Sequence, residues 1–253
     1  MKKLVFFSLF LFLFSCKTNR NSTIEDVSQP NKSVDYFDAS RDRKIPVAFY
    51  YNESLAFKKM PVVIFSHGYG RNNPDSNLDY NYLLSNLAEK GYFVASIQHE
   101  LPTDDLVPLE GKPQVVRRPN WDRGAENILF VLNQLKRDFT RLNYQKVTIA
   151  GHSNGGDMSV LFVEQHSDLV WKLITLDQRR YPFPHLSKPK MYSLRSSDQP
   201  ADDGVLPTLE EQKKLGITII KLPNTIHNDM DKSGTIDQKK EILTYFVKFL
   251  NEN

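Results

Sequence analysis

A serine flanked by glycines follows an apolar run in the segment KVTIAGHSNGGDMSV, residues 146–160. Gly151, Ser153 and Gly155 fit the pattern G-x-S-x-G, in which a strand turns sharply into a helix and exposes the serine hydroxyl. Side chains two positions before and two positions after the serine would collide in such a turn, so glycines are required there. A glycine-rich turn without chemistry can match the same short pattern. Between a predicted strand and a predicted helix, the pattern indicates that Ser153 is a nucleophile.

Ser153 needs a general base, and His227 is the best placed of the six histidines in the chain. It lies in the segment KLPNTIHNDMD, after the last predicted strand and before the last predicted helix. Where the serine pattern is catalytic, the histidine comes last in chain order, after the serine and the acid. The remaining histidines occupy the serine turn, a glycine-rich loop, a strand end, a helix end and a proline-flanked loop: His152, His67, His99, His166 and His185. We therefore expect His227 to take the proton from Ser153.

Two aspartates are candidates for the acid that orients His227. Asp177 ends the predicted strand LITLD, and Asp198 follows the next predicted strand in SLRSSDQPADDG. Either carboxylate could reach the imidazole, fix its tautomer and stabilise its charged form. The other aspartate would then be a cap or turn residue, because aspartate commonly accepts hydrogen bonds from backbone N–H groups. The residues alone leave the choice open.

A glycine-rich loop follows another predicted strand in the segment FSHGYGRN, residues 65–72. In enzymes with the serine turn, such a loop supplies one of the two N–H groups that stabilise the oxyanion of the reaction. We expect this donor to be the backbone N–H of Tyr69. The second donor is the backbone N–H of Asn154, which follows the serine at the positive end of a helix. Without the serine turn, the two glycines would indicate only a flexible loop.

Strands and helices alternate along most of the chain. Continuous apolar runs such as PVVIFS and YFVASI are typical of strands covered on both faces, and GAENILFVLNQLKR has the spacing of an amphipathic helix. The predicted strands are residues 44–51, 61–66, 92–97, 146–150, 173–176, 190–194 and 217–222. The predicted helices are residues 80–90, 124–137, 154–166, 209–215 and 239–250. This order predicts an α/β protein with a mostly parallel central sheet, helices on both faces, and a site at the carboxyl ends of the strands.

Residues 103–120 contain several prolines and no clear period, which predicts a long loop over the site. Its apolar residues would cover the substrate pocket: Leu106, Val107, Leu109, Val115 and Val116. Four arginines could meet an acidic substrate, although solvated arginines on a surface are the commoner case: Arg117, Arg118, Arg179 and Arg180.

Together these segments resemble the α/β-hydrolases, in particular the platelet-activating factor acetylhydrolase branch and, more loosely, the dienelactone hydrolase-like proteins. The resemblance is carried by FSHGYGRN, GYFVASIQHE, IAGHSNGG, ITLDQRRYPFP and IHND, which occur in family order between residues 62 and 229. It implies the α/β-hydrolase fold, with Ser153 as nucleophile, His227 as base and Asp177 as acid, because this branch takes its acid after the sixth strand. The chain departs from the branch in RSSDQP, which offers Asp198 where most other α/β-hydrolases have their acid. Asp198 therefore stays the alternative.

The resemblance implies a serine hydrolase that cleaves carboxylic esters with short-chain or lipid-like acyl groups through an acyl-enzyme. Such a carboxylesterase or lipase-like enzyme needs no metal and no organic cofactor. One alternative is a catalytically silent surface lipoprotein that binds a glycan or a protein partner. A peptidase or an acyltransferase is another, because the fold does not fix the chemistry.

An acidic segment near the end of the chain, DMDKSGTIDQKKE at residues 229–241, resembles a calcium-binding loop. The twelfth position of such a loop should be a bidentate glutamate. Here it is Lys240, and Glu241 comes one residue late. A lysine places positive charge where the main ligand of the ion belongs, so we predict no metal site.

The N-terminal residues have the pattern of a bacterial lipoprotein signal. After a short basic start, residues 4–14 are almost entirely apolar, too short a run to span a bilayer. The run ends in LFSC, which resembles a lipobox, and Cys16 is the only cysteine in the chain. We predict a signal peptide at 1–15, a lipidated Cys16 with a flexible tether at 16–33, and a hydrolase domain at 34–253. An ordinary cleaved signal with an incidental cysteine is the alternative reading.

The composition is that of one globular domain: 253 residues, 40% hydrophobic and 25% charged. Removal of the signal peptide takes away Lys2 and Lys3 and lowers the formal net charge from +3 to about +1. This balance does not favour a nucleic-acid partner. The predicted partners are a small ester substrate and a membrane of the bacterial cell envelope, to which the exported protein would be attached by its lipid.

Overall fold

The computed structural model describes residues 29–55 and 59–252. The predicted signal peptide, Cys16 and most of the predicted tether lie outside the described residues. The first strand begins at Lys32, two residues before the predicted start of the domain. Within the described ranges, no helix combines the length and the apolar character needed to cross a membrane.

The described residues form strands and helices that alternate along the chain. The strands are β1 (Lys32–Asp38), β2 (Arg43–Tyr50), β3 (Pro61–Ser66), β4 (Phe93–Ile97), β5 (Asn143–His152), β6 (Lys172–Leu176), β7 (Lys190–Arg195) and β8 (Thr218–Lys221). The α-helices are α1 (Asn81–Glu89), α2 (Pro113–Val116), α3 (Arg118–Asp138), α4 (Ser153–Gln165), α5 (Leu209–Leu215) and α6 (Ile236–Asn251). Short 3₁₀ turns are η1 (Glu53–Leu55), η2 (Ser76–Leu78), η3 (Ser167–Leu169) and η4 (His227–Met230).

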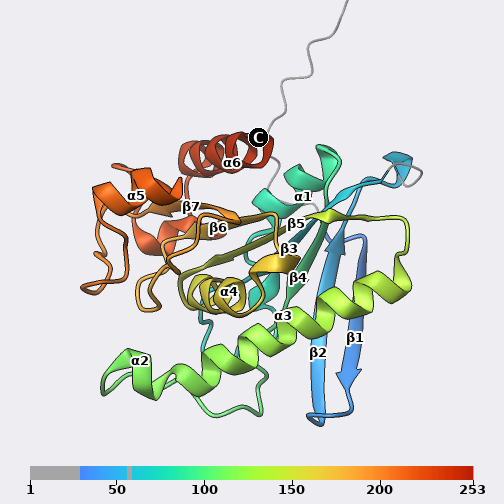
Figure 1. The fold of residues 1–253 in the computed structure, drawn as a ribbon. Helices are drawn as coiled ribbons and strands as arrows, with labels where there is room; N and C mark the ends of the chain where they lie inside the picture. The colour runs from blue at the N-terminus through green and yellow to red at the C-terminus, as the bar shows by residue number, and fades with distance from the viewer. Residues whose placement is uncertain (1–28, 56–58, 253) are drawn as a thin grey trace, which may run out of the picture.

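The strands build one sheet of eight described strands in the order β1-β2-β4-β3-β5-β6-β7-β8. β1 and β2 pair antiparallel, β2 pairs antiparallel with β4, and the pairs from β4 to β8 are parallel. Parallel neighbours need crossover connections, which helices supply on the faces of the sheet. Figure 1 shows α1 and α6 on one side of the sheet and α3 and α4 on the other. The predicted α/β architecture is confirmed.

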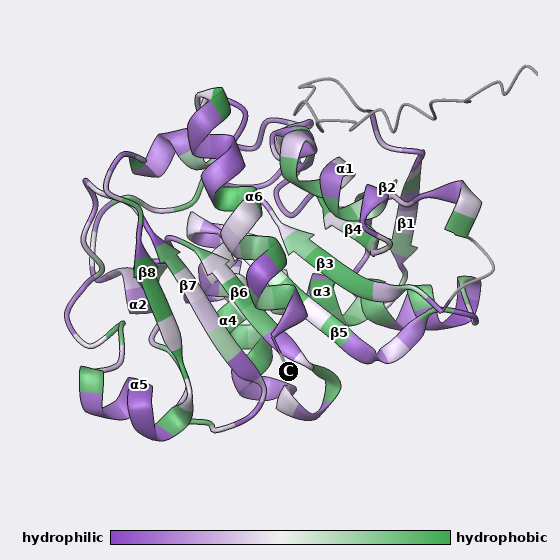
Figure 2. Ribbon diagram, turned by 90° about the horizontal axis from the view of Figure 1, so that it is seen from above, coloured by the Kyte–Doolittle hydropathy of each residue, from purple (hydrophilic) through white to green (hydrophobic). Residues whose placement is uncertain are grey.

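Two apolar clusters fill the two faces of the sheet. One joins the sheet to α3 and α4 and contains Ile128 and Val160, and the other joins it to α1 and α6 and contains Leu83 and Phe246. In Figure 2, β3 is coloured as hydrophobic, whereas the peripheral α5 is mostly hydrophilic. The residues from Val62 to Phe65 are completely buried, as expected of a strand covered on both faces.

The largest difference from the sequence prediction lies in residues 103–120. The segment contains α2, and α3 begins at Arg118 instead of at residue 124. Pro113 and Pro119 lie in the first turns of these helices. A proline costs no hydrogen bond there, because the first N–H groups of a helix have no partner within it. These prolines are therefore helix starts, and the prediction of one long loop is wrong.

The apolar side chains of this segment do not form the predicted cover. Leu106, Leu109 and Val115 are 65%, 69% and 65% exposed, and only Val107 is buried among the large apolar side chains of the loop before α2. The sequence pattern also missed β1, which is paired with β2 alone at the edge of the sheet. Its residues KSVDYFD are mostly exposed or half-buried, so they lack the continuous apolar run of a central strand.

Candidate active site

The turn between β5 and α4 has the geometry that the glycine–serine pattern predicts. Ser153 has φ +50°, in the left-handed region, where a residue other than glycine is strained by about 1–2 kcal/mol. A Cβ on Gly151 would lie 2.4 Å from the carbonyl oxygen of Gly155, and a Cβ on Gly155 would lie 2.3 Å from that of His67. Because backbone atoms occupy both places, each position accepts only glycine.

Ser153, His227 and Asp177 form a continuous chain of hydrogen bonds. The Oγ of Ser153 lies 2.9 Å from Nε2 of His227, and Nδ1 of His227 lies 2.5 Å from Oδ2 of Asp177. Asp177 is completely buried and His227 is 6% exposed. The serine and histidine are 74 residues apart in the chain, so only the assembled sheet brings them together.

Asp198, the alternative acid, also contacts His227, but through the backbone. Its Oδ1 accepts a hydrogen bond of 2.8 Å from the N–H of His227. The structure therefore brings both predicted aspartates to the histidine, with Asp177 at the imidazole and Asp198 at the main chain. Asp177 has φ +53°, a second left-handed residue in the site.

Asp177 is held as a carboxylate by its neighbours. Oδ1 lies 2.9 Å from Nη2 of Arg195 and accepts a hydrogen bond of 3.0 Å from the N–H of Ser196. Burial by itself raises the pKa of Asp177, but the hydrogen bond from His227 and the charge of Arg195 outweigh burial and lower the pKa. A charged Asp177 can stabilise the imidazolium that forms when His227 takes a proton.

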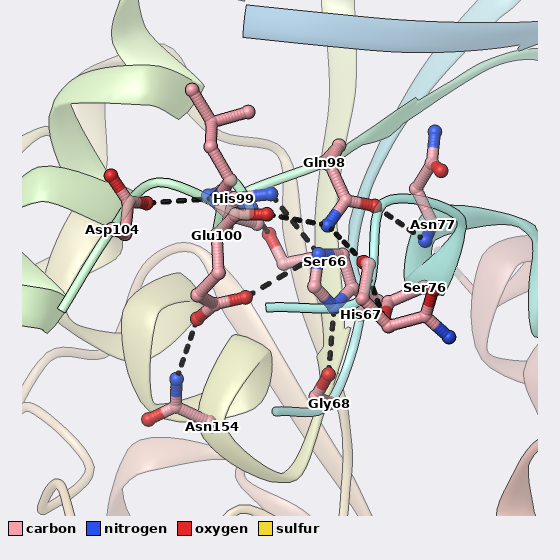
Figure 3. A network of polar contacts seen from close by, with 12 residues as sticks. Ser66, His67, Gly68, Ser76, Asn77, Gln98, His99, Glu100, Asp104 and Asn154 are labelled. Carbon is pink, nitrogen blue, oxygen red and sulfur yellow. Dashed lines mark hydrogen bonds and ion pairs between the residues drawn. The ribbon is translucent and has the colours of Figure 1, made fainter. Parts of the chain in front are cut away.

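The side chain of Asn154 is fixed next to the serine. Its Oδ1 accepts a hydrogen bond of 2.8 Å from the indole N–H of Trp121. Its Nδ2 donates to Oδ1 of Asn120 at 2.8 Å and to Oε1 of Glu100 at 3.2 Å, the second of which Figure 3 shows. The first N–H groups of a helix lack intrahelical partners, and no side chain caps α4. The predicted oxyanion donor thus belongs to a rigid residue at an uncapped helix start.

The loop after β3 carries Tyr69 and packs against the serine turn. The N–H of Gly68 donates to the phenol oxygen of Tyr80 at 3.1 Å, and that phenol lies 2.7 Å from Nδ1 of His152. The phenol oxygen of Tyr69 accepts a hydrogen bond of 3.0 Å from the N–H of Val107. The loop with one predicted oxyanion donor is therefore tied to the turn with the other.

A second serine–histidine pair lies in the buried network of Figure 3, but it is closed to substrate. The Nε2 of His99 is 2.9 Å from Oγ of Ser66, and both residues are at most 1% exposed. The N–H of His99 donates to Nε2 of His67 at 3.0 Å, so the proton of His67 is on Nδ1, which donates to the Gly68 carbonyl. Burial, together with the charges of His67 and nearby arginines, lowers the pKa of His99 well below its usual value. These two histidines connect the ends of β3 and β4.

His152, the residue before the serine, is a neutral neighbour of His227. Its ring centroid lies 4.6 Å from that of His227. Burial, and then the charge of His227, lower the pKa of His152 to about 3. His152 therefore adds no positive charge beside His227 near neutral pH.

Several residues of the site were missed by the sequence analysis. Arg195 and Glu100 come at or just after the carboxyl ends of β7 and β4, where sites of this architecture lie, and that position is the only signal for them. Asn120 and Trp121 gave no signal, because the prediction placed the start of α3 after them.

The acidic segment 229–241 leads into α6. The hydroxyl of Thr235 caps this helix by accepting a hydrogen bond from the N–H of Gln238. Among the residues that the structure describes, no group of three or more His, Cys, Asp or Glu side chains is arranged to hold a metal ion.

No family model and no curated protein matches the chain. Solved structures match it over most of its length, at low identity. A ferulic acid esterase from Streptomyces cinnamoneus is 18% identical, with a TM-score of 0.63 over 89% of this chain and 92% of the other. Esterase 2 from Thermogutta terrifontis, phosphonylated by cyclosarin, is 12% identical, with a TM-score of 0.62 over 88% and 96%. An alpha-beta serine hydrolase homologue from Coxiella burnetii is 13% identical, with a TM-score of 0.56 over 87% and 99%.

At these identities the likeness concerns the arrangement of the backbone. Each alignment covers most of this chain and most of the other chain, so the similarity extends over whole domains and not over one shared motif. Together with the mostly parallel sheet and the serine turn after β5, it shows that this chain has the α/β-hydrolase fold.

Proposed function

We propose that the protein is a serine hydrolase that cleaves carboxylic esters, with Ser153 as nucleophile, His227 as base and Asp177 as acid. The observation that carries the proposal is the hydrogen-bonded chain: 2.9 Å from Oγ of Ser153 to Nε2 of His227, and 2.5 Å from Nδ1 of His227 to Asp177. A serine hydroxyl in such a chain loses its proton to the imidazole as it attacks a carbonyl carbon.

The reaction would run in two halves. Oγ of Ser153 bonds to the ester carbon while Nε2 of His227 takes the hydroxyl proton. The imidazolium then gives this proton to the departing alcohol oxygen as the C–O bond breaks, which leaves an acyl-enzyme. Water attacks the acyl carbon, His227 accepts its proton and returns it to Oγ, and the carboxylic acid is released.

The negative oxygen of each tetrahedral intermediate would be stabilised by the N–H groups of Tyr69 and Asn154. Support comes from the uncapped start of α4, whose positive end faces the serine turn, and from the rigid side chain of Asn154. Donors fixed before the reaction stabilise developing charge without having to reorganise. No metal or organic cofactor takes part in this scheme.

The finer assignment is also a proposal. The position of Asp177 after β6 fits the platelet-activating factor acetylhydrolase branch that the sequence resembles. From this resemblance we propose that the substrates are esters with short-chain or lipid-like acyl groups. We further propose that the mature protein is held at a membrane of the bacterial cell envelope by a lipid on Cys16.

A fluorophosphonate probe tests the nucleophile directly. The probe forms a stable bond with an activated serine, and the Thermogutta esterase with a similar fold is phosphonylated by a related compound. We expect wild-type protein to be labelled and Ser153→Ala to remain unlabelled. Equal labelling of both, or labelling of neither, would overturn the assignment of Ser153.

A panel of p-nitrophenyl esters from acetyl to octanoyl tests the reaction. Turnover that disappears in Ser153→Ala supports an esterase, and the best chain length defines the acyl group. Labelling of Ser153 without turnover of any ester would instead favour a peptidase or an acyltransferase. A protein that neither reacts with the probe nor hydrolyses the esters would be the silent surface lipoprotein.

A further inference from the structure

Three arginines gather beside the triad acid. Arg179 and Arg180 follow Asp177 in the loop after β6, and Arg117 lies at the end of α2. Arg117 and Arg179 are half-buried. A hydrogen bond from the side chain of Gln114 to the carbonyl of Arg180 brings the end of α2, and with it Arg117, to this loop.

The loop that carries Arg179 is fixed by a buried carboxylate. Oδ1 of Asp157, in the first half of α4, accepts hydrogen bonds of 3.0 Å and 2.9 Å from the N–H groups of Arg180 and Tyr181. The guanidinium of Arg180 forms an ion pair with Asp202. Among the described residues, the side chain of Arg179 forms no hydrogen bond or ion pair, so the bonds of Arg180 and Tyr181 hold this part of the loop.

The helix α2 brings the other arginine to this loop. Nε2 of Gln114 donates a hydrogen bond of 2.9 Å to the carbonyl of Arg180. Arg117 follows at the end of the same helix, and its Nε donates to the carbonyl of Pro108 at 3.0 Å. Residues 103–120, which were predicted as a loop over the site, thus place Arg117 near the loop after Asp177.

The carboxylates near the cluster are already engaged. Asp177 binds His227 and Arg195, Asp202 binds Arg180, and Asp157 accepts backbone N–H groups. Within residues 29–55 and 59–252, neither Arg117 nor Arg179 has a carboxylate at ion-pair distance.

Burial and repulsion oppose the charges of these two half-buried arginines, and the nearby carboxylates Asp157 and Asp202 offset only part of this cost. Burial, and next the charge of Arg180, lower the pKa of both Arg117 and Arg179. The charge of Arg179 also acts on Asp177 and on His152, both of which are in contact with His227. An anion bound between the guanidiniums of Arg117 and Arg179 would offset their charges. It would then lie close to the proposed triad.

We propose that Arg179, assisted by Arg117, binds a negatively charged group of the substrate, so that the preferred ester carries a carboxylate or another anion besides the bond that is cleaved. The inference rests on the proposed function, since it names the substrate class of the same site. A guanidinium binds a carboxylate through two parallel N–H donors, which fixes orientation as well as charge. Arg179 and Arg117 therefore determine specificity, and Ser153, His227 and Asp177 perform the chemistry.

The test compares esters that differ only in charge. 4-Acetoxybenzoate and 4-acetoxybenzamide carry or lack the anion on the leaving group, and mono-4-nitrophenyl adipate and its amide carry or lack it on the acyl group. For wild-type protein, kcat/KM should be at least about tenfold higher for the anionic member of one pair, within the range of one charged hydrogen bond. In Arg179→Gln this preference should disappear, while Arg179→Lys should keep part of it.

Arg118→Gln is the matched control. Arg118 is one residue from Arg117, but its side chain is 45% exposed and pairs with Asp122 at 2.8 Å. The control should keep the wild-type ratio between charged and neutral esters. Neutral esters hydrolysed as fast as anionic ones in both pairs, or equal effects of Arg118→Gln and Arg179→Gln, would overturn the proposal.

A binding measurement keeps this test separate from that of the proposed function. Ser153→Ala protein, titrated calorimetrically with 4-acetoxybenzoate, should bind it more tightly than the amide, and added salt should weaken this binding. The double variant with Arg179→Gln should bind both compounds equally. If Ser153 proves not to be a nucleophile, anion binding that depends on Arg179 still supports the anion subsite. If Ser153→Ala binds 4-acetoxybenzoate and the amide equally, the subsite is refuted.

Discussion

At His227, two aspartates act on different parts of one residue. Asp177 meets the imidazole and Asp198 meets the backbone N–H. Only the first position can set the tautomer of the ring and neutralise the imidazolium, whereas the second can only hold the main chain in place. Loss of the charge on Asp177 should therefore affect catalysis directly, and loss of the charge on Asp198 should affect only the position of the His227 backbone.

Replacement of each aspartate by asparagine should separate these roles. Asp177→Asn removes the negative charge at the imidazole, and its amide can favour the wrong tautomer, so we expect turnover of an ester to fall by about 10⁴-fold. In Asp198→Asn the side-chain oxygen can still accept the N–H of His227, so we expect less than a tenfold loss. Steady-state kcat with a p-nitrophenyl ester measures both. Similar small effects from the two variants would rule out the triad as drawn.

His152 should make the protein less stable in acid. Its pKa is about 3 in the folded protein and about 6.5 in an unfolded chain. Below pH 6.5 the unfolded chain therefore binds a proton that the folded protein refuses, so stability is lost as the pH falls from 6.5 toward 3. At 1.36 kcal/mol per pH unit, the loss at pH 4.5 is about 2–3 kcal/mol.

His152→Gln should reduce this acid sensitivity, because glutamine does not titrate and can still accept a hydrogen bond from Tyr80. The measurement is the free energy of urea unfolding at pH 7 and pH 4.5. His185→Gln is the control, since the side chain of His185 is 75% exposed. A pH dependence that is the same in wild type and both variants would contradict the assignment.

Among single residues, the sequence predicted Ser153 and His227 from local pattern and chain order, and the structure places their side chains 2.9 Å apart. Ser153 is recognisable because its turn requires glycines at fixed spacing, and His227 because chain order excludes its competitors. The choice between Asp177 and Asp198 could not be made, because both end neighbouring strands and both reach His227. Glu100 and Arg195 act through contacts between strands that are distant in the chain, and no local pattern announces them.

At the scale of elements, the start of α4 is pressed against the end of β3. A Cβ on Gly155 would lie 2.3 Å and 2.4 Å from the carbonyl oxygens of His67 and Ser66. These are backbone atoms of the central sheet and its loop, so they cannot move aside. Gly155→Ala should cost about 3 kcal/mol or more and displace Ser153 from His227, which abolishes ester turnover. Urea unfolding and turnover measure the two effects.

Gly124→Ala on α3 is the matched control for this contact. A Cβ there would also collide, at 2.3 Å and 2.4 Å from Sδ and Cγ of Met158 and 3.0 Å from its Cβ, but Sδ and Cγ belong to a flexible side chain that can change rotamer. Alanine also favours a helix over glycine by about 1 kcal/mol, which offsets part of the strain. We expect a loss of no more than about 1–2 kcal/mol and nearly normal turnover. Equal damage from both alanines would mean that the contact with β3 is not decisive.

The central strands were predictable because their residues are buried on both sides, whereas β1, at the edge of the sheet and mostly exposed or half-buried, was missed. β3 was predicted with correct bounds from a continuous apolar run. The first turns of α3 were missed because Pro119 was interpreted as a breaker, although a proline is well tolerated at a helix start. A proline breaks a helix in its interior but is tolerated in its first turn. The spacing of apolar residues around residue 119 did not show where the helix begins, so the effect of this proline could not be predicted.

For the whole molecule, the strand order places residues of the proposed active site in one row. β5, β6 and β7 are neighbours in the sheet, and their carboxyl ends deliver Ser153, Asp177 and Arg195 to one edge. His227 arrives from η4, after β8 at the end of the same row. All of these residues lie inside the described domain, far along the chain from Cys16.

This separation of anchor and site leads to a prediction about the full-length protein in a bacterial host. If Cys16 is lipidated, Cys16→Ala should move the protein from the membrane fraction to the soluble fraction, because a mature protein with a net charge of about +1 has little electrostatic attraction to a membrane. Ester turnover per molecule should stay unchanged, since no residue of the proposed site lies before Tyr69. Fractionation and intact mass measure the anchor, with Ser8→Ala as the control. A Cys16→Ala protein with the wild-type distribution would show that something other than this lipid holds the protein at the membrane.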